Sequence, residues 1–210
     1  KSGLLQNWEP LESLKLSPLP CRGDRPLAVF SQVKVQYCGR DVCGPVSFAL
    51  HPGERVVLDG KNGSGKSSLL KVLLGESIPH SGTITTSAGL VVSYVPQDTA
   101  HLNGLLSHFA EKHHLDESLF KGILRKMGFE RVQFEKKMED FSAGQKKKVL
   151  LAASLCQPAH LYVWDEPLNF VDLHTRLQIT SLLRQAQPTM LFVEHDRAFQ
   201  EEIATQKISL

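Results

Sequence analysis

Residues 60–67 read Gly60-Lys61-Asn62-Gly63-Ser64-Gly65-Lys66-Ser67 and fit the phosphate-loop pattern G-x-x-x-x-G-K-[ST] at every position. The apolar run 55–59 before this loop predicts a buried strand, and the run 68–74 after it predicts a helix that Gly75 ends. Glycines let successive backbone N–H groups face one anion, and the helix dipole adds positive potential. The alternative is a glycine turn before an ordinary helix, which this strand–loop–helix context disfavours.

The bulk properties are those of a globular chain with a packed core. It has 210 residues, 41% of them apolar, and a formal net charge of +2. Such a near-balanced charge gives no overall electrostatic case for binding nucleic acid or a membrane surface. No apolar run approaches the length of a membrane span, and no secretory signal is visible. We therefore expect a cytoplasmic protein that does not insert into a membrane.

Two further observations concern the cysteines and the first residue of the chain. The four cysteines lack close zinc-ligand spacing, so we expect free thiols in a reducing compartment at Cys21, Cys38, Cys43 and Cys156. The chain opens on Lys1 rather than on methionine, and we expect it to be a piece of a longer protein.

The order of predicted elements indicates an α/β fold with a mostly parallel sheet. Residues 1–26 are rich in proline and predict a linker, on which Trp8 and Leu14 could pack against the domain or a neighbour. Residues 27–210 predict one domain. Its strands are expected at 28–37, 46–50, 55–58, 81–86, 90–95, 161–164 and 190–193. Its helices are expected within 102–138 and at 145–155 and 173–184, before a closing helix and strand.

A pair of acidic residues follows the predicted strand 161–164. Parallel α/β sheets place ligands at the carboxyl ends of their strands, so Asp165 could hold Mg²⁺ together with the Ser67 hydroxyl. Glu166 comes next and could polarise an attacking water as a general base. The alternative is an acidic strand end of the kind common on protein surfaces.

Two basic side chains complete this predicted phosphate site. Lys66 could reach the β- and γ-phosphates as a point charge. His195 follows the apolar strand 190–193 and could meet the γ-phosphate, where charge builds during transfer. A structural role is the alternative for this histidine.

Further motifs make the chain similar to ATP-binding-cassette (ABC) proteins. The stretch Phe141-Ser142-Ala143-Gly144-Gln145 resembles their signature segment, L-S-G-G-Q, and Tyr94-Val95-Pro96-Gln97 resembles their glutamine loop. The stretch 165–172 resembles their strand motif and the loop after it, and His195 their switch histidine. The motifs occur in family order over residues 27–210.

The resemblance implies an ABC-type nucleotide-binding domain with a parallel core sheet, an antiparallel β subdomain and a small helical subdomain at about 102–140. It implies ATPase activity with Mg²⁺, in which Glu166, His195 and Gln97 act in catalysis and Ser67, Gln97 and Asp165 hold the metal. ATP-binding residues would be Tyr37, which would stack on adenine, and Asn62, Gly63, Ser64, Gly65, Lys66, Ser67 and Ser68.

The resemblance also implies a second cassette as partner, either another half of a longer protein or a second copy of this chain. The cassettes would pair head to tail, so that Ser142, Ala143, Gly144 and Gln145 contact the partner's ATP. Ser142 could cap a helix whose N-terminus favours an anion, and a simple capped helix is the alternative. An isolated cassette would then be a weak or inactive ATPase. Three residues depart from the family pattern, namely Ala143, Phe170 and Trp164.

The sequences of the motifs resemble those of the ABC-F branch, and in particular those of the C-terminal cassette of its antibiotic-resistance members, which protect the ribosome. The stretch between Lys66 and Ser142 is short compared with transporter cassettes. The ribosome would then be a partner of the whole protein, and residues 1–26 would be the tail of an interdomain linker. The alternatives are a membrane transporter's cassette and a housekeeping translation factor.

The lysine run Lys146-Lys147-Lys148 has two interpretations. A charged run on a helix predicts a solvated face, and this is the interpretation we favour. Direct contact with RNA is the alternative.

Overall fold

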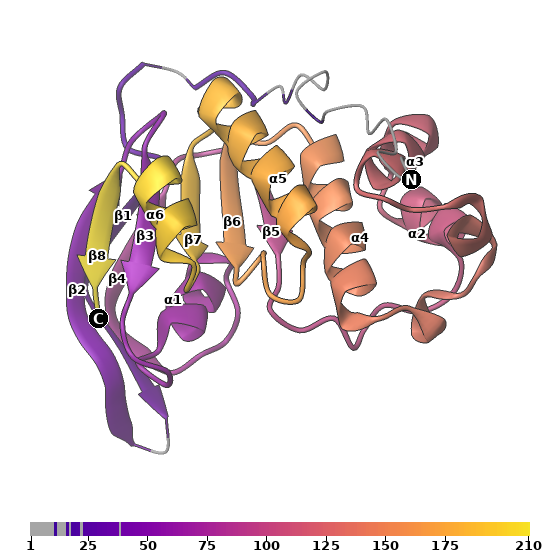
Figure 1. Ribbon diagram of the computed structural model, residues 1–210. Helices are drawn as coiled ribbons and strands as arrows, with labels where there is room; N and C mark the ends of the chain where they lie inside the picture. Colours follow the sequence, from indigo (N-terminus) through magenta and orange to yellow (C-terminus); the bar gives the residue numbers. More distant parts are fainter. Residues whose placement is uncertain (1–10, 12–15, 17, 22, 38) are drawn as a thin grey trace.

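The computed structural model describes residues 11, 16, 18–21, 23–37 and 39–210, and it contains two β-sheets with helices around them (Figure 1). The larger sheet has five strands in the order β5-β6-β7-β3-β8, and all neighbouring strands are parallel. These strands are β3 (Arg55–Asp59), β5 (Val92–Val95), β6 (Leu161–Asp165), β7 (Met190–Val193) and β8 (Gln206–Ser209). The carboxyl ends of β3, β6 and β7 therefore meet at one edge of the sheet.

The smaller sheet is antiparallel, with strands β1 (Ala28–Tyr37), β2 (Arg40–Leu50) and β4 (His80–Thr86) in the order β2-β1-β4. Strand β2 begins at Arg40 rather than at the predicted Val46, because the hairpin pairs Tyr37 with Arg40. Gly44 and Pro45 are residue types that disfavour a strand, so the sequence pattern does not predict one at these positions. They are accommodated here by irregular register between β1 and β2.

Each face of the parallel sheet packs in a separate hydrophobic core. Strand side chains alternate between faces, so neighbouring residues of β3, β6 and β7 belong to different cores. One core lies between this sheet and the antiparallel sheet with α1, and includes Val56, Leu58, Val163, Leu191, Leu69 and Leu70. The other lies under the remaining helices and includes Val57, Tyr162, Trp164, Phe192, Leu151 and Ile179.

Helices cover the sheet and build a separate helical region. Helix α1 (Lys66–Leu73) follows the glycine loop, and α4 (Ala143–Cys156), α5 (Leu173–Ala186) and α6 (Arg197–Ile203) belong to the second half. Figure 1 shows α2 (Leu106–Lys112) and α3 (Glu117–Lys126) at the opposite end of the molecule from β1 and β2. Two 3₁₀ helices follow them, Arg131–Glu135 and Met138–Asp140. The predicted fold class, with its parallel core, antiparallel subdomain and helical subdomain, is confirmed.

The structure also shows how Trp164, the segment before β1 and the cysteines are placed. Trp164 fits its strand because its ring is buried and its Nε1 donates a hydrogen bond to Ser154 Oγ at 2.9 Å. In the segment before β1, Leu11 is fully buried in the core under the helices, and Leu19 N donates to Ala159 O. Trp8, Leu14 and Cys38 lie outside the described residues, whereas Cys21, Cys43 and Cys156 are free thiols.

Within the described part of the chain, no helix is both long and apolar enough to cross a membrane.

Candidate active site

The loop between β3 and α1 has the backbone shape that its glycines predict. Gly63 and Gly65 have φ angles of 80° and 86°, which is the left-handed region that favours glycine. Gly65 is the N-cap of α1 and supplies no side-chain hydrogen bond to it. The first N–H groups of α1 are therefore free to bind an anion.

The Lys66 side chain folds back over this loop. It is 7% exposed, and its Nζ donates hydrogen bonds to Gly60 O at 2.8 Å and Lys61 O at 2.9 Å. The neighbouring Ser64 hydroxyl is buried and has no hydrogen-bond partner among the described residues. A buried hydroxyl without a partner is costly, so the loop has both a cation and an unused donor to offer a ligand.

Asp165 ends β6 next to the start of α1. Its carboxylate is 1% exposed, and its Oδ1 accepts a hydrogen bond of 3.0 Å from Ser67 Oγ. Burial raises the pKa of Asp165, and the hydrogen bond from Ser67 opposes that rise. Its Oδ2 is buried without a partner within the described part of the chain. A carboxylate oxygen without a partner beside a hydroxyl is a donor set that suits Mg²⁺, a hard cation that prefers oxygen ligands.

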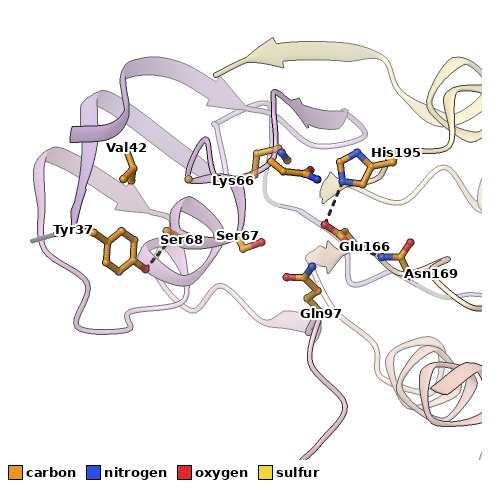
Figure 2. Close-up of a pocket in the computed structure, with 12 residues that line it drawn as sticks. Tyr37, Val42, Lys66, Ser67, Ser68, Gln97, Glu166, Asn169 and His195 are labelled. Carbon is orange, nitrogen blue, oxygen red and sulfur yellow. Dashed lines mark hydrogen bonds and ion pairs between the residues drawn. The ribbon is translucent and has the colours of Figure 1, made fainter. Parts of the chain in front are cut away.

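Glu166 follows in a strained backbone conformation, with φ of 47°. Its Oε1 lies 3.3 Å from His195 Nε2, and its Oε2 accepts a hydrogen bond from Asn169 Nδ2 (Figure 2). Its side chain is 13% exposed. The carboxylate is therefore held from two sides and points into the space beside the glycine loop, where it can serve as a base.

These groups share one cleft of about 710 Å³. Figure 2 shows Lys66, Ser67, Gln97, Glu166 and His195 arranged around it. A volume of this size suits a nucleotide. The described lining consists of Tyr37, Val42, Asn62, Gly63, Gly65, Lys66, Ser67, Ser68, Gln97, Glu166, Asn169 and His195.

Most residues selected from the sequence meet in this cleft. Tyr37 stands at its far end, 46% exposed, with its hydroxyl 2.9 Å from Ser68 Oγ. Ser64 and Asp165 lie behind the lining. Two lining residues, Val42 and Asn169, were not predicted as site residues from the sequence. For Asn169 the available signal was its position three residues after Glu166, at the turn that follows β6.

The segment Ser142–Gln145 is not part of this lining. It forms the start of α4, where Ser142 Oγ accepts a hydrogen bond from Gln145 N and the Gln145 side chain accepts one from Ser142 N. This reciprocal pair is a capping box. Gly144 lies against the loop after β6, because a Cβ there would come within 2.3 Å of Phe170 O.

Comparison with known proteins identifies the fold and its family. The family model described as ABC transporter matches residues 43–169, which is more than half of the chain. The chain belongs to the ABC transporter family of ATPase domains. A solved structure of a bacterial Atm1-family ABC exporter with ATP bound superposes on 94% of this cassette and 39% of that chain, with a TM-score of 0.76 and 19% identity. At that identity the similarity supports the fold alone.

Curated relatives of this cassette have names that indicate different uses. It is 32% identical to the probable ATP-binding protein YheS of Escherichia coli K12, over 82% of this chain and 28% of YheS. It is also 32% identical to the zinc import ATP-binding protein ZnuC of Buchnera aphidicola, over 82% of this chain and 76% of ZnuC. It is 30% identical to the ribosome protection protein VmlR of Bacillus subtilis, over 77% of this chain and 30% of VmlR. The chain thus spans about a quarter to a third of YheS and VmlR, and similarity alone does not choose a branch.

The lysine run of the cassette corrects a prediction. Lys147 is 2% exposed, and its Nζ donates to Pro96 O and Gln97 O, so this part of the helix is not a solvated face. Lys148 is also largely buried and contacts Met127 O and Asp172 Oδ2. Burial raises the pKa of Asp172, but hydrogen bonds from Lys148 and Thr175 outweigh it and hold the value at about 2. The sequence could not reveal these acceptors, because they lie on distant segments.

Gly144→Ala is expected to lower ATP hydrolysis by at least about tenfold, because a misplaced catalytic loop is costly. The new methyl group would clash with Phe170 O and displace the loop that carries Asn169, the partner of Glu166. Steady-state phosphate release by the complete protein measures the effect. Gly122→Ala is the matched control, since a Cβ added at Gly122 on α3 would meet nothing within 4 Å. Equal rates for Gly144→Ala and the wild type would show that this contact does not position the loop.

Proposed function

We propose that this cassette binds and hydrolyses ATP in an ABC-F-type protein that protects the ribosome against antibiotics. The proposed assignment to the ABC-F branch rests on the small helical region, in which α2 has 7 residues and α3 has 10. Transporter cassettes of the family use this region to contact their membrane helices. The similarity to the ribosome protection protein VmlR and the ABC-F-like residues of the motifs support the same choice.

In this proposal the glycine loop and the N-terminus of α1 bind the phosphates. Lys66 leaves Gly60 O and Lys61 O and turns its ammonium to the β- and γ-phosphates, and the Ser64 hydroxyl gains a partner. Residues 62–68 then surround the phosphate chain. Tyr37 stands at the cleft end where the adenine ring would stack, with Val42 beside it.

Ser67, Asp165 and Gln97 are the residues proposed to hold Mg²⁺. The Asp165 oxygen without a partner and the adjacent Ser67 hydroxyl fit that ion. Mg²⁺ would supply neutralisation of phosphate charge. Glu166 accepts the proton of the attacking water, while Asn169 and His195 hold its two oxygens in place.

ABC cassettes work as pairs, and the structure is consistent with half of a shared site. The Ser142–Gln145 segment at the capped start of α4 is not among the described residues that line the cleft of this chain, and we propose that it serves the ATP of a second cassette. That partner is either another part of a longer protein, for which residues 1–26 would be linker, or a second copy. We place the protein in the cytoplasm on this proposal.

The isolated 210-residue chain is expected to be a weak ATPase whose specific activity rises with protein concentration. The physical reason is that each hydrolysing site needs residues from two cassettes, so the active species forms by association. Phosphate release measured over a hundredfold range of about 0.1–10 μM protein tests this. A high specific activity that is constant across that range would contradict the shared site.

Antibiotic susceptibility tests the proposed role in ribosome protection. Cells that carry the complete gene are expected to tolerate a ribosome-targeting antibiotic better than cells with the Glu166→Gln gene. Ribosome sedimentation with the same two proteins is the second measurement. Ribosome binding without any change in susceptibility would favour a housekeeping translation factor. Membrane spans in the complete protein or its partner, without ribosome binding, would favour the transporter alternative that similarity to ZnuC keeps open.

A further inference from the structure

A buried cation lies beneath the candidate active site. Lys147 is on α4 and is 2% exposed, yet it carries an ammonium group. Its Nζ donates hydrogen bonds to Pro96 O at 2.9 Å and Gln97 O at 3.1 Å. Burying an ammonium group costs several kcal/mol unless polar partners compensate, so this arrangement calls for a reason beyond filling space.

The charges around Lys147 provide part of the compensation. Burial lowers the pKa of Lys147, and nearby carboxylates raise it, among which Asp165 has the largest effect. The others are Glu166, Glu194 and Asp98. The ammonium and these carboxylates therefore stabilise one another, which offsets part of the cost of burying the cation.

The two carbonyl acceptors belong to the segment that ends in Gln97. That segment directly follows β5, and the Gln97 side chain lines the cleft. Without the ammonium, the carbonyl groups of Pro96 and Gln97 would lose this donor, and their segment would lose two hydrogen bonds to α4. The neighbouring Lys148 does not share this contact, because it is bonded to Met127 O and Asp172 instead.

We propose that Lys147 is a positioning residue that fixes the backbone of Gln97 against α4 and thereby sets the affinity of the cleft for Mg²⁺ in the presence of nucleotide. The proposal rests on the proposed ATP site. Lys147 touches neither the nucleotide nor the metal; it acts through the segment that carries Gln97. Groups that orient metal ligands in this way contribute about 10- to 100-fold to metal affinity.

The test compares Lys147→Met with Lys146→Met in the full 210-residue chain. Methionine keeps an unbranched apolar side chain close in length to the stem of lysine, and it removes the charge and the donors. A fluorescent ATP analogue measures nucleotide affinity without Mg²⁺, and a Mg²⁺ titration at fixed analogue gives the half-saturation. For Lys147→Met we expect a half-saturation raised about tenfold, while affinity without Mg²⁺ stays at the wild-type value. Lys146→Met is expected to leave both values unchanged.

Folding is checked by thermal unfolding of each variant. Lys147→Arg keeps a cation and donors for the two carbonyls, and it is expected to recover part of the lost Mg²⁺ affinity. If Lys147→Met does not fold, Lys147→Gln replaces it under the same criteria. An unchanged half-saturation in the folded variant overturns the proposal. A parallel loss of nucleotide affinity without Mg²⁺ also overturns it, because that result indicates general damage to the cleft.

Failure of the proposed function has a different signature in this experiment. In that case the wild-type chain itself would show no Mg²⁺-dependent binding of the analogue. A wild type that responds to Mg²⁺ together with a Lys147→Met variant that responds equally would reject only the positioning role.

Discussion

Glu166→Gln in the complete protein is expected to bind ATP normally and to lose hydrolysis by at least about 10²-fold, the usual contribution of a general base. Glutamine keeps the size of the side chain, so the contacts with Asn169 and His195 can persist in altered form. It cannot accept a proton from water at neutral pH. The bound ATP should therefore hold the two cassettes together, and a paired state should accumulate.

Two measurements test the expected behaviour of Glu166→Gln. Phosphate release gives the rate, and size-exclusion chromatography with Mg²⁺ and ATP detects the paired state. Glu111→Gln is the control, because Glu111 is an exposed glutamate on α2. Wild-type turnover by Glu166→Gln would show that another group accepts the proton.

Lys66→Ala is expected to weaken ATP binding by about 10- to 150-fold. The estimate follows from the loss of one charged hydrogen bond of about 1.5–3 kcal/mol. The side chain already lies over the glycine loop, with its ammonium near the site of the phosphates. Its removal leaves the phosphate charge without its nearest cation.

Isothermal titration calorimetry with the 210-residue chain measures this change. Lys61→Ala is a matched control, because Lys61 is in the same loop but is exposed. Equal affinity of Lys66→Ala and the wild type, with equal thermal stability, would refute a direct role of Lys66 in phosphate binding.

The sequence predicted the sheet and the glycine loop well, because both depend on local patterns. Strands 28–37 and 190–193 have the bounds expected, since their β-branched and aromatic residues are bordered by breaks in the pattern. The carboxylates at the end of β6 could also be predicted from the sequence, because parallel α/β sheets place ligands at the carboxyl ends of their strands. Strand β2 was predicted too short, since only its pairing with β1 extends it to Arg40.

The remaining features depend on contacts between distant segments. Lys146, Lys147 and Lys148 are chemically identical, and the acceptors that Lys147 and Lys148 reach lie on distant segments, at Pro96 and Gln97 for the first and at Met127 and Asp172 for the second. Likewise, Asn169 becomes a partner of Glu166 through a turn whose φ angles no residue pattern reveals. Sequence periodicity contains no information about such acceptors.

The burial of Leu11 has a practical consequence for work with shortened proteins. A chain that starts at Leu27 would keep every strand of the two sheets, yet it would uncover the apolar surface that Leu11 and Leu16 now cover. Exposed apolar patches of this kind favour aggregation. A shortened cassette is therefore expected to be less soluble than the 210-residue chain, and a boundary placed before Leu11 is the better choice for producing it.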